Sequence, residues 1–306
     1  MNLYLLNDEE RSIVGETYVK HSKELAKSKA VNYVSKRLPF LVEEILKYEH
    51  KYKNIVLYCQ RGGYRSKSFA SLLNAMDIKV HRLESGYKGY RKYVRENLNR
   101  ICQNASLIVL AGNTGCGKTK ILQLLKDRRY PVIDLEDLAK HRGSNLGHVG
   151  LEPQPSQKMF ESLLLEEFLK YGDKNIFIEG ESSKIGDIYL PKSLLENIKN
   201  SYCIRVDSPL EHRVSNLVEE YGKLDYQEEL LQSLSHLEGY ISKENIEKFQ
   251  KSIMDGDLKV VARELCENYY DKKYKKRDAD FSLLNVDEKE SVKKLIAIYE
   301  EKNKGA

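Results

Sequence analysis

A glycine-rich octapeptide, Gly112-Asn113-Thr114-Gly115-Cys116-Gly117-Lys118-Thr119, directly follows an apolar run at residues 107–111. It matches the P-loop pattern G-x-x-x-x-G-K-[ST], in which backbone N–H groups surround a phosphate at the start of a helix. Lys118 is expected to pair with phosphate oxygens, and the Thr119 hydroxyl is a candidate ligand for Mg²⁺. The motif therefore predicts a strand, a phosphate-binding loop and a helix over residues 107–126.

Further apolar runs follow the P-loop at intervals. They are read as buried strands at residues 131–135, 175–179 and 201–206, with a helix at residues 157–171. This alternation predicts an α/β fold with a parallel sheet and helices on both faces. After Asp207-Ser208-Pro209 only helical periodicity is visible. We therefore predict a P-loop NTPase-like domain over residues 104–222 and a helical C-terminal region over residues 223–306.

A cysteine loop lies in the N-terminal third of the chain. Cys59 ends a short apolar run at residues 54–58 and is followed by Gln60-Arg61-Gly62-Gly63-Tyr64-Arg65, with helical spacing from Ser66. Two glycines allow successive N–H groups to face one point, and the helix start adds positive partial charge. Together with Arg61 and Arg65, these features predict a lowered pKa for Cys59 and a nucleophilic thiolate that accepts sulfur, selenium or phosphorus from an anionic donor.

Two other interpretations of Cys59 stay open. The spacing Cys-x5-Arg also describes cysteine phosphatases, with Arg65 as the phosphate clamp, although Tyr58 stands where those enzymes usually place His. A buried structural cysteine is the simpler alternative. The remaining cysteines, at positions 102, 116, 203 and 266, have no metal-ligand spacing, which argues against a zinc site or a disulfide framework.

Acidic residues follow two of the predicted strands. Glu179 and Glu181 stand at the end of the run at 175–179, where a carboxylate that orders a metal or water is expected. Asp134 and Glu136 are weaker candidates of the same kind. Capping of helices is the alternative role for Glu179 and Glu181.

The excess of positive charge is small, since Lys+Arg number 51 and Asp+Glu 46. The distribution of the basic residues along the chain is more informative. Two basic segments, at residues 82–100 and 272–277, suit a polyanionic partner, with a solvated helix face as the alternative. The candidate contact residues are Lys88, Arg91, Lys92, Arg95, Lys272, Lys273 and Lys275. The first residues do not form a signal peptide, and no apolar run approaches the ~20 residues of a membrane helix, so we expect a cytoplasmic protein without a membrane partner.

Together these segments resemble the tRNA 2-selenouridine synthase family, in which a rhodanese domain is fused to a P-loop domain. The resemblance covers nearly the whole chain and implies a rhodanese-like domain over residues 1–103. Besides the two loops, it rests on Glu84-Ser85-Gly86-Tyr87-Lys88, His141-Arg142-Gly143-Ser144, Gln154-Pro155-Ser156-Gln157, Glu179-Gly180-Glu181-Ser182 and Tyr269-Tyr270-Asp271.

The resemblance implies a substrate and two co-substrates. The substrate is a 2-thiouridine at the wobble position of tRNA, geranyl diphosphate alkylates its sulfur, and selenophosphate supplies the selenium. Cys59, Arg61 and Arg65 would serve selenium transfer, and the P-loop would hold the diphosphate. In the segment that includes Ser144, Arg142 is a candidate phosphate contact and His141 a candidate for proton transfer.

The chain departs from the family pattern near its start. Family members carry a strand with Asp-Val-Arg ahead of the segment that here begins at Asn2, so we expect that a separate polypeptide supplies this strand, that the start codon is misplaced, or that the rhodanese half is altered. Ser183 stands where Arg is common in the family. A P-loop kinase for a small molecule, or a nucleotide-binding module with a vestigial cysteine loop, remains the alternative.

Overall fold

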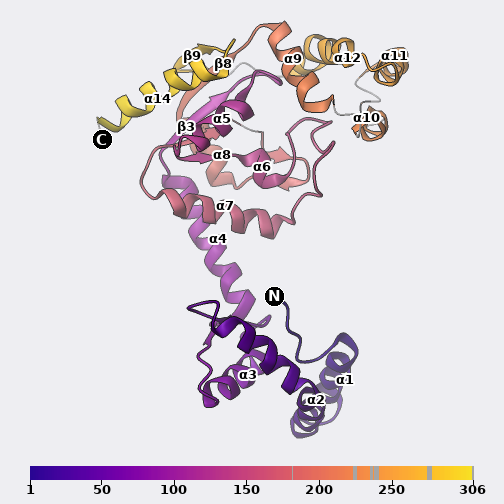
Figure 1. The fold of residues 1–306 in the computed structure, drawn as a ribbon, viewed down its shortest axis with the longest axis vertical. Helices are drawn as coiled ribbons and strands as arrows, with labels where there is room; N and C mark the ends of the chain where they lie inside the picture. Colours follow the sequence, from indigo (N-terminus) through magenta and orange to yellow (C-terminus); the bar gives the residue numbers. More distant parts are fainter. Residues whose placement is uncertain (181, 223–225, 235–236, 238–240, 274–277, 305–306) are drawn as a thin grey trace. The chain divides into compact units, whose positions relative to one another are not determined.

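The chain divides into two compact units, Met1–Tyr93 and Val94–Ala306 (Figure 1). The structure is a computed structural model that describes residues 1–180, 182–222, 226–234, 237, 241–273 and 278–304. Among these residues, none of the helices combines the length and the apolar character that crossing a bilayer requires.

A five-stranded parallel sheet forms the centre of the second unit. Its strands are β3 (Leu107–Ala111), β4 (Val132–Ile133), β5 (Ile176–Glu179), β8 (Tyr202–Asp207) and β9 (Phe281–Leu284). They lie in the order β4-β5-β3-β8-β9, so β3 is central and pairs with both β5 and β8 (Figure 1). In open parallel sheets, ligands bind at the carboxyl ends of the strands where the strand order reverses. Here that point is the end of β3, where the P-loop begins.

Helices cover both faces of this sheet. Ile108 and Leu110 of β3 share a buried apolar cluster with side chains of α5 (Lys118–Asp127) and α14 (Glu288–Lys304). Their neighbour Val109 points to the opposite face, because side chains alternate along a strand, and α8 (Lys192–Asn200) packs against β3. The predicted parallel sheet with buried strands is confirmed, because a sheet covered on both faces selects continuous apolar runs.

Beside the sheet, the chain forms a largely helical region. The connecting elements are α6 (Leu135–Ala139), α7 (Gln157–Tyr171), the hairpin of β6 (Lys184–Ile185) with β7 (Ile188–Tyr189), and α9 (Leu210–Tyr221). The later ones are α10 (Gln227–Leu234), α11 (Lys243–Met254), α12 (Leu258–Glu264), the π-helix η3 (Leu265–Tyr270) and α13 (Asp271–Lys273). Figure 1 shows α10, α11 and α12 gathered next to α9. Together with η3 they contribute to a buried apolar cluster that includes Leu230, Phe249 and Leu265.

The expectation of helical structure throughout the C-terminal region is wrong at residues 281–284. These residues form β9, which pairs in parallel with β8. Only Leu283 of this strand is buried, as is common for an edge strand. A four-residue run with one buried position carries too little periodicity to distinguish a strand from a helical turn.

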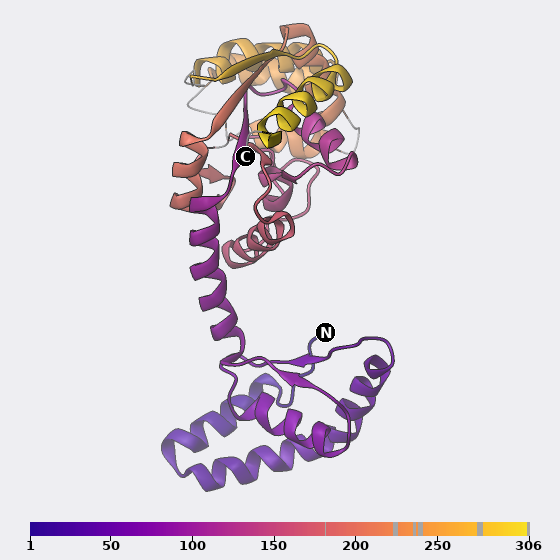
Figure 2. The same ribbon diagram turned by 90° about the vertical axis from the view of Figure 1, so that its left-hand side faces the viewer.

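The first unit combines helices with a small sheet. Helices α1 (Asp8–Lys20) and α2 (Lys23–Glu49) lie side by side (Figure 2), and α3 (Tyr64–Ala75) connects the parallel strands β1 (Val56–Leu57) and β2 (His81–Arg82). The apolar run at 54–58 thus contains a strand, β1, and two residues of β1 pair with two of β2. The core of the unit consists of Leu41, Ile45, Phe69, Ala70, Leu73, Ile78 and Val80.

Candidate functional site

The P-loop joins β3 to α5 at the carboxyl end of the central strand. Gly115 and Gly117 have φ values of +81° and +89°, in the left-handed region that favours glycine. A Cβ atom at position 117 would lie 2.6 Å from Nδ2 of Asn285. Both the backbone and the packing therefore require glycine at position 117. The resulting turns allow successive N–H groups to face one point at the start of α5.

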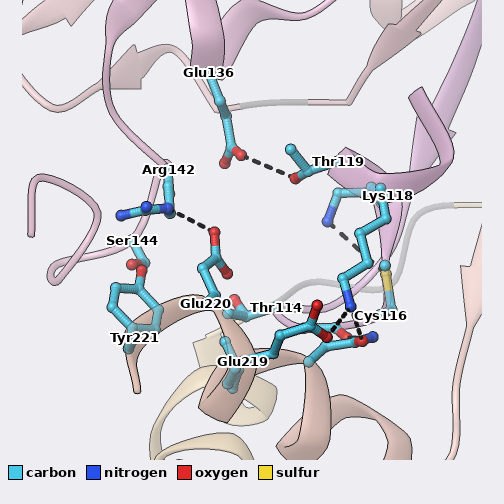
Figure 3. Close-up of a pocket in the computed structure, with 15 residues that line it drawn as sticks. Thr114, Cys116, Lys118, Thr119, Glu136, Arg142, Ser144, Glu219, Glu220 and Tyr221 are labelled. Carbon is cyan, nitrogen blue, oxygen red and sulfur yellow. Dashed lines mark hydrogen bonds and ion pairs between the residues drawn. The ribbon is translucent and has the colours of Figure 1, made fainter. Parts of the chain in front are cut away.

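The P-loop borders a cavity of about 280 Å³ (Figure 3). Of the residues predicted from sequence, the cavity brings together Thr114 to Thr119, Glu136, Arg142 and Ser144. Further lining residues that the sequence did not indicate are Lys120, Asn216, Leu217, Glu219, Glu220 and Tyr221. Three cationic side chains and three carboxylates thus surround one hollow, a composition suited to a ligand with charged phosphate groups.

Each cationic side chain in the cavity already has a partner. Lys118 Nζ donates to the Gly112 carbonyl oxygen at 2.8 Å, and Lys120 Nζ donates to Glu219 Oε2 at 2.6 Å. Arg142 Nε lies 2.6 Å from Glu220 Oε1 (Figure 3). An anionic ligand must therefore exchange these contacts for contacts with its own oxygens.

Arg142 contacts two half-buried acidic groups that line the cavity with it, Glu220 and Tyr221. Burial raises the pKa of Glu220, although Arg142 opposes this effect. Burial also raises the pKa of Tyr221 to about 12, and its ring lies 5.1 Å from the Arg142 guanidinium. Tyr221 therefore keeps its hydroxyl proton near pH 7, and its hydroxyl group already interacts with the Ser144 side chain.

The acidic candidates take different places. Glu136 lines the cavity and accepts a hydrogen bond from Thr119 Oγ1 at 3.4 Å. Glu179 is fully buried, does not line the cavity, and accepts from the Glu136 backbone N–H at 3.1 Å. Asp134 caps α6 by accepting from the Asp137 N–H. Glu181 lies outside the described residues.

Thr119 and Glu136 present oxygen donors of the kind that Mg²⁺ takes together with waters and substrate phosphate oxygens. The described part of the chain contains no group of three or more His, Cys, Asp and Glu side chains that could hold a metal by themselves. The residues present therefore fit an ion that is bound jointly with a phosphate ligand.

His141 is not brought to the P-loop cavity. Its side chain is buried, its Nδ1 accepts from the Gly143 N–H at 3.2 Å, and its ring stacks on His148 with centroids 6.2 Å apart. Burial, together with His148, lowers the pKa of His141. The neutral ring thus supports the turn that carries Arg142 and Ser144.

A second, apolar cavity of about 40 Å³ adjoins the first. It shares Leu217 and Tyr221 with the P-loop cavity. Its other lining residues are Leu146, Val218, Leu230, Leu234, Ile253, Leu258, Val261, Ala262, Leu265 and Tyr270. A polar cavity and an apolar cavity therefore lie next to each other, and Leu217 and Tyr221 of α9 form the wall between them.

The cysteine loop (residues 59–66) follows β1. Three of its carbonyl oxygens accept hydrogen bonds from β2 and from the start of the next helix. The Tyr87 N–H donates to the Cys59 carbonyl and the Lys88 N–H to that of Gln60, both at 3.0 Å, from the start of α4 (Gly86–Asn104). Arg82 Nη1 donates to the Gly62 carbonyl at 2.6 Å. Because these carbonyls are occupied on one side, the N–H groups of the loop are left to face the thiol.

Burial opposes ionisation of Cys59, but the Ser66 hydroxyl and the backbone N–H groups of Ser66, Arg61 and Gly63 outweigh it and lower its pKa to about 7. The Ser66 Oγ atom lies 3.2 Å from Cys59 Sγ. The predicted direction of the pKa shift is confirmed. The side chains of Arg61 and Arg65 are exposed, and Ser66 is a contributor that the sequence did not single out.

We predict that Cys59 reacts with iodoacetamide at a rate that rises with pH and reaches half its maximum near pH 7, because the thiolate is the nucleophile. Ser66→Ala removes a donor to the thiolate and should move this midpoint to higher pH. The rates are measured by mass spectrometry of the Cys59 peptide. Cys203, which is buried in β8, serves as the internal control. An unchanged midpoint in the Ser66 variant would contradict this account.

The basic candidates are only partly described. Lys88, Lys92 and Arg95 are exposed on α4, where Arg91 is half-buried, and Lys272 is exposed near the end of the helical region. Lys273 ends α13, and Lys275 lies outside the described residues.

A loop with the P-loop sequence pattern, placed between the central strand of a parallel sheet and a helix, defines the second unit as a P-loop domain. The family model for the tRNA 2-selenouridine synthase AAA domain matches residues 105–303. The chain therefore belongs to the tRNA 2-selenouridine synthase family.

Curated relatives of the chain carry the name of the same family. The tRNA 2-selenouridine synthase of Nitrosomonas europaea is 37% identical over 226 residues, which cover 72% of this chain and 58% of the relative. That of Hydrogenovibrio crunogenus is 38% identical over 231 residues, which cover 72% of this chain and 62% of the relative. The chain thus spans about three fifths of their lengths. A solved structure, TT1252 from Thermus thermophilus, is 18% identical with a TM-score of 0.32, covering 65% of this chain and 98% of that one.

Proposed function

We propose that this chain is a transferase that converts wobble 2-thiouridine in tRNA to 2-selenouridine through an S-geranylated intermediate. The observation that carries the proposal is the family match over residues 105–303. The curated relatives bear the name of this activity. The pairing of a P-loop cavity with a cysteine of lowered pKa supplies the two chemical sites that the reaction needs.

The first proposed step uses the P-loop. The diphosphate of geranyl diphosphate would bind the loop N–H groups and Lys118, with Mg²⁺ held by Thr119 and Glu136. Its hydrocarbon chain would enter the apolar cavity beyond Leu217 and Tyr221, which must widen from its present 40 Å³ to accept it. Alkylation of the thiocarbonyl sulfur makes it a leaving thiol, which a bare thiocarbonyl is not.

The second proposed step uses the cysteine loop. The parallel arrangement of β1, α3 and β2, with the cysteine directly after β1, supports a rhodanese-like first unit. Selenophosphate would be held by Arg61, Arg65 and the loop N–H groups, with Cys59 serving selenium transfer. The Cys59 thiolate would take the phosphoryl group, so that the Se–P bond breaks and selenide is released, and water would hydrolyse the S-phosphocysteine to phosphate. Attack of the selenide at C2 forms the C–Se bond as the bond to the geranylated sulfur breaks, and geranylthiol leaves.

We further propose that the first unit pairs with a strand from a separate polypeptide. A two-stranded sheet is marginally stable by itself. Val56 in β1 and Tyr58 just after it are 53% and 63% exposed, which is unusual beside a catalytic loop in a parallel sheet. An additional strand along β1 would extend the sheet and place its own side chains beside Val56 and Tyr58.

Contacts with tRNA are assigned to the basic residues. Lys88, Arg91, Lys92 and Arg95 on α4, together with Lys272, Lys273 and Lys275 in the C-terminal region, would bind backbone phosphates. Since this contribution is electrostatic, tRNA affinity should fall steeply with salt. A cytoplasmic location follows from the substrate.

The test is a direct assay of the modified nucleoside. Incubation of the chain with 2-thiouridine-containing tRNA, geranyl diphosphate and selenophosphate is expected to yield 2-selenouridine, identified by mass spectrometry of the digested tRNA. Omitting selenophosphate should stop the reaction at geranylated 2-thiouridine. Unchanged thiouridine with both co-substrates present would refute the proposal for this chain, and turnover of a nucleotide without tRNA would favour a small-molecule kinase instead.

A further inference from the structure

Each carbonyl oxygen of the P-loop from Gly112 to Gly117 accepts a hydrogen bond, and those of Thr114, Gly115 and Cys116 accept from side chains outside the loop. Lys118 Nζ donates to Gly112, the Cys116 N–H to Asn113, Arg213 Nε to Thr114, Asn216 Nδ2 to Gly115 and Asn285 Nδ2 to Cys116. The Ile121 N–H, within α5, donates to the Gly117 carbonyl at 3.0 Å. The carbonyls from Gly112 to Gly117 are therefore all engaged.

This arrangement has a consequence for ligand binding. A peptide unit presents its N–H and its C=O on opposite sides, so fixing a carbonyl on one side of the loop directs the following N–H to the other. A carbonyl that rotated toward the ligand would place a negative dipole against phosphate oxygens. Donors that hold the carbonyls in place therefore preorganise the anion site.

Arg213 is the only charged side chain of α9 in this set, and it is buried. Its Nε donates to the Thr114 carbonyl at 2.9 Å, while Nη1 and Nη2 donate to the two carboxylate oxygens of Asp271 at 2.9 and 2.8 Å. All three nitrogens are thus directed by fixed partners, a geometry that a planar guanidinium provides and a lysine ammonium does not.

Asp271 also reaches the loop by a second route. Its Oδ1 accepts a hydrogen bond from Asn113 Nδ2 at 2.8 Å. The carboxylate, at the start of α13, therefore holds one P-loop side chain directly and the Thr114 peptide through Arg213. The side chain of Asn113 and the peptide unit of Thr114 therefore both depend on the Asp271 carboxylate.

We infer that Arg213 is a positioning residue for the phosphate site, and that Asp271 acts through it and through Asn113. Neither residue lines the cavity, so neither touches the ligand. The inference rests on the proposed function in one respect, namely that the P-loop binds a diphosphate.

The test measures the affinity for inorganic pyrophosphate with Mg²⁺ by isothermal titration calorimetry, on the full chain. Arg213→Met is expected to weaken binding by about tenfold or more, because small misplacements of a first contact shell have effects of this size. Arg213→Lys should recover part of the loss. In the Arg213→Met background, Asp271→Asn should add less than it does alone, since both act on the Thr114 peptide.

The matched control is Arg263→Met. Arg263 of α12 also pairs with a carboxylate across to α9, Glu211, with Nη2 and Oε2 2.6 Å apart, but it does not touch the P-loop. Its affinity for pyrophosphate should equal that of the wild type. The melting temperatures of all variants are measured to detect loss of stability. If Arg213→Met does not fold, Asp271→Asn, which is the milder change, tests the same inference.

The possible failures are distinguishable. Wild-type affinity in Arg213→Met or in Asp271→Asn would overturn the inference while leaving the P-loop proposal intact. An equal loss of pyrophosphate affinity in Arg263→Met would show that the effect is general destabilisation, and this result would also overturn the inference. If the wild-type chain itself does not bind pyrophosphate, the proposed role of the P-loop fails, and the inference fails with it.

Discussion

Replacing Lys118 by alanine is expected to weaken pyrophosphate binding by about 10- to 150-fold and to abolish geranylation of tRNA. A hydrogen bond to a charged group contributes about 1.5–3 kcal/mol, which corresponds to this range of affinities. Lys118 Nζ donates a hydrogen bond to the carbonyl oxygen of Gly112, the first residue of the P-loop. To bind the ligand, it needs to exchange only this oxygen for the phosphate oxygens. Titration calorimetry gives the affinity, and mass spectrometry of tRNA digests gives the geranylated product.

Lys126→Ala is the matched control. Lys126 lies in the last turn of the same helix, α5, and its side chain is exposed. This variant loses the same charge from the same helix without touching the cavity, so its affinity and activity should be those of the wild type. A Lys118 variant that still geranylates tRNA at the wild-type rate would remove the P-loop from the proposed first step.

The strand, loop and helix of the P-loop were predictable because each depends on neighbouring residues. The apolar run of β3 at Leu107–Ala111 and the helix α5 lie where the sequence places them. The lowered pKa of Cys59 was predictable for the same reason, since the donors to its thiol come from the next seven residues. Local chemistry of this kind is visible in a single sequence.

The rest of the site depends on contacts between residues far apart in the chain. Glu219, Glu220 and Tyr221 reach the cavity because α9 follows β8, the strand beside the P-loop. In the sequence, these residues appear only as two glutamates and a tyrosine at the end of a predicted helix. Such a pattern is equally typical of a solvent-exposed helix face, so it does not indicate a site. Asn285 reaches the loop from the end of β9, a strand too short to be predicted.

The two loops share a physical device that the sequence does not reveal. In both, donors from a distant segment occupy the carbonyl oxygens: Arg82 and the start of α4 for the cysteine loop, and Arg213, Asn216 and Asn285 for the P-loop. Glycines permit the required backbone turns, but they do not select one turn from many. The selection comes from these donors, which explains why the glycines could be recognised and the donors could not.

Replacing Cys59 by alanine is expected to eliminate 2-selenouridine, with a loss of at least about 10³-fold, because a nucleophile has no substitute within its loop. The P-loop cavity is built from residues of the other compact unit, so geranylation should continue. The Cys59 variant should therefore accumulate S-geranylated 2-thiouridine in tRNA. Mass spectrometry of digested tRNA measures all three nucleosides in one experiment.

The Cys59 and Lys118 variants provide controls for each other. If the two steps occur at separate sites, tRNA geranylated by Cys59→Ala is a substrate for Lys118→Ala, and a mixture of the two proteins restores 2-selenouridine. Restoration requires that the geranylated tRNA leaves one molecule and binds another. If the Cys59 variant instead leaves the thiouridine unmodified, the thiol participates in alkylation as well, and the assignment of one step to each loop is wrong.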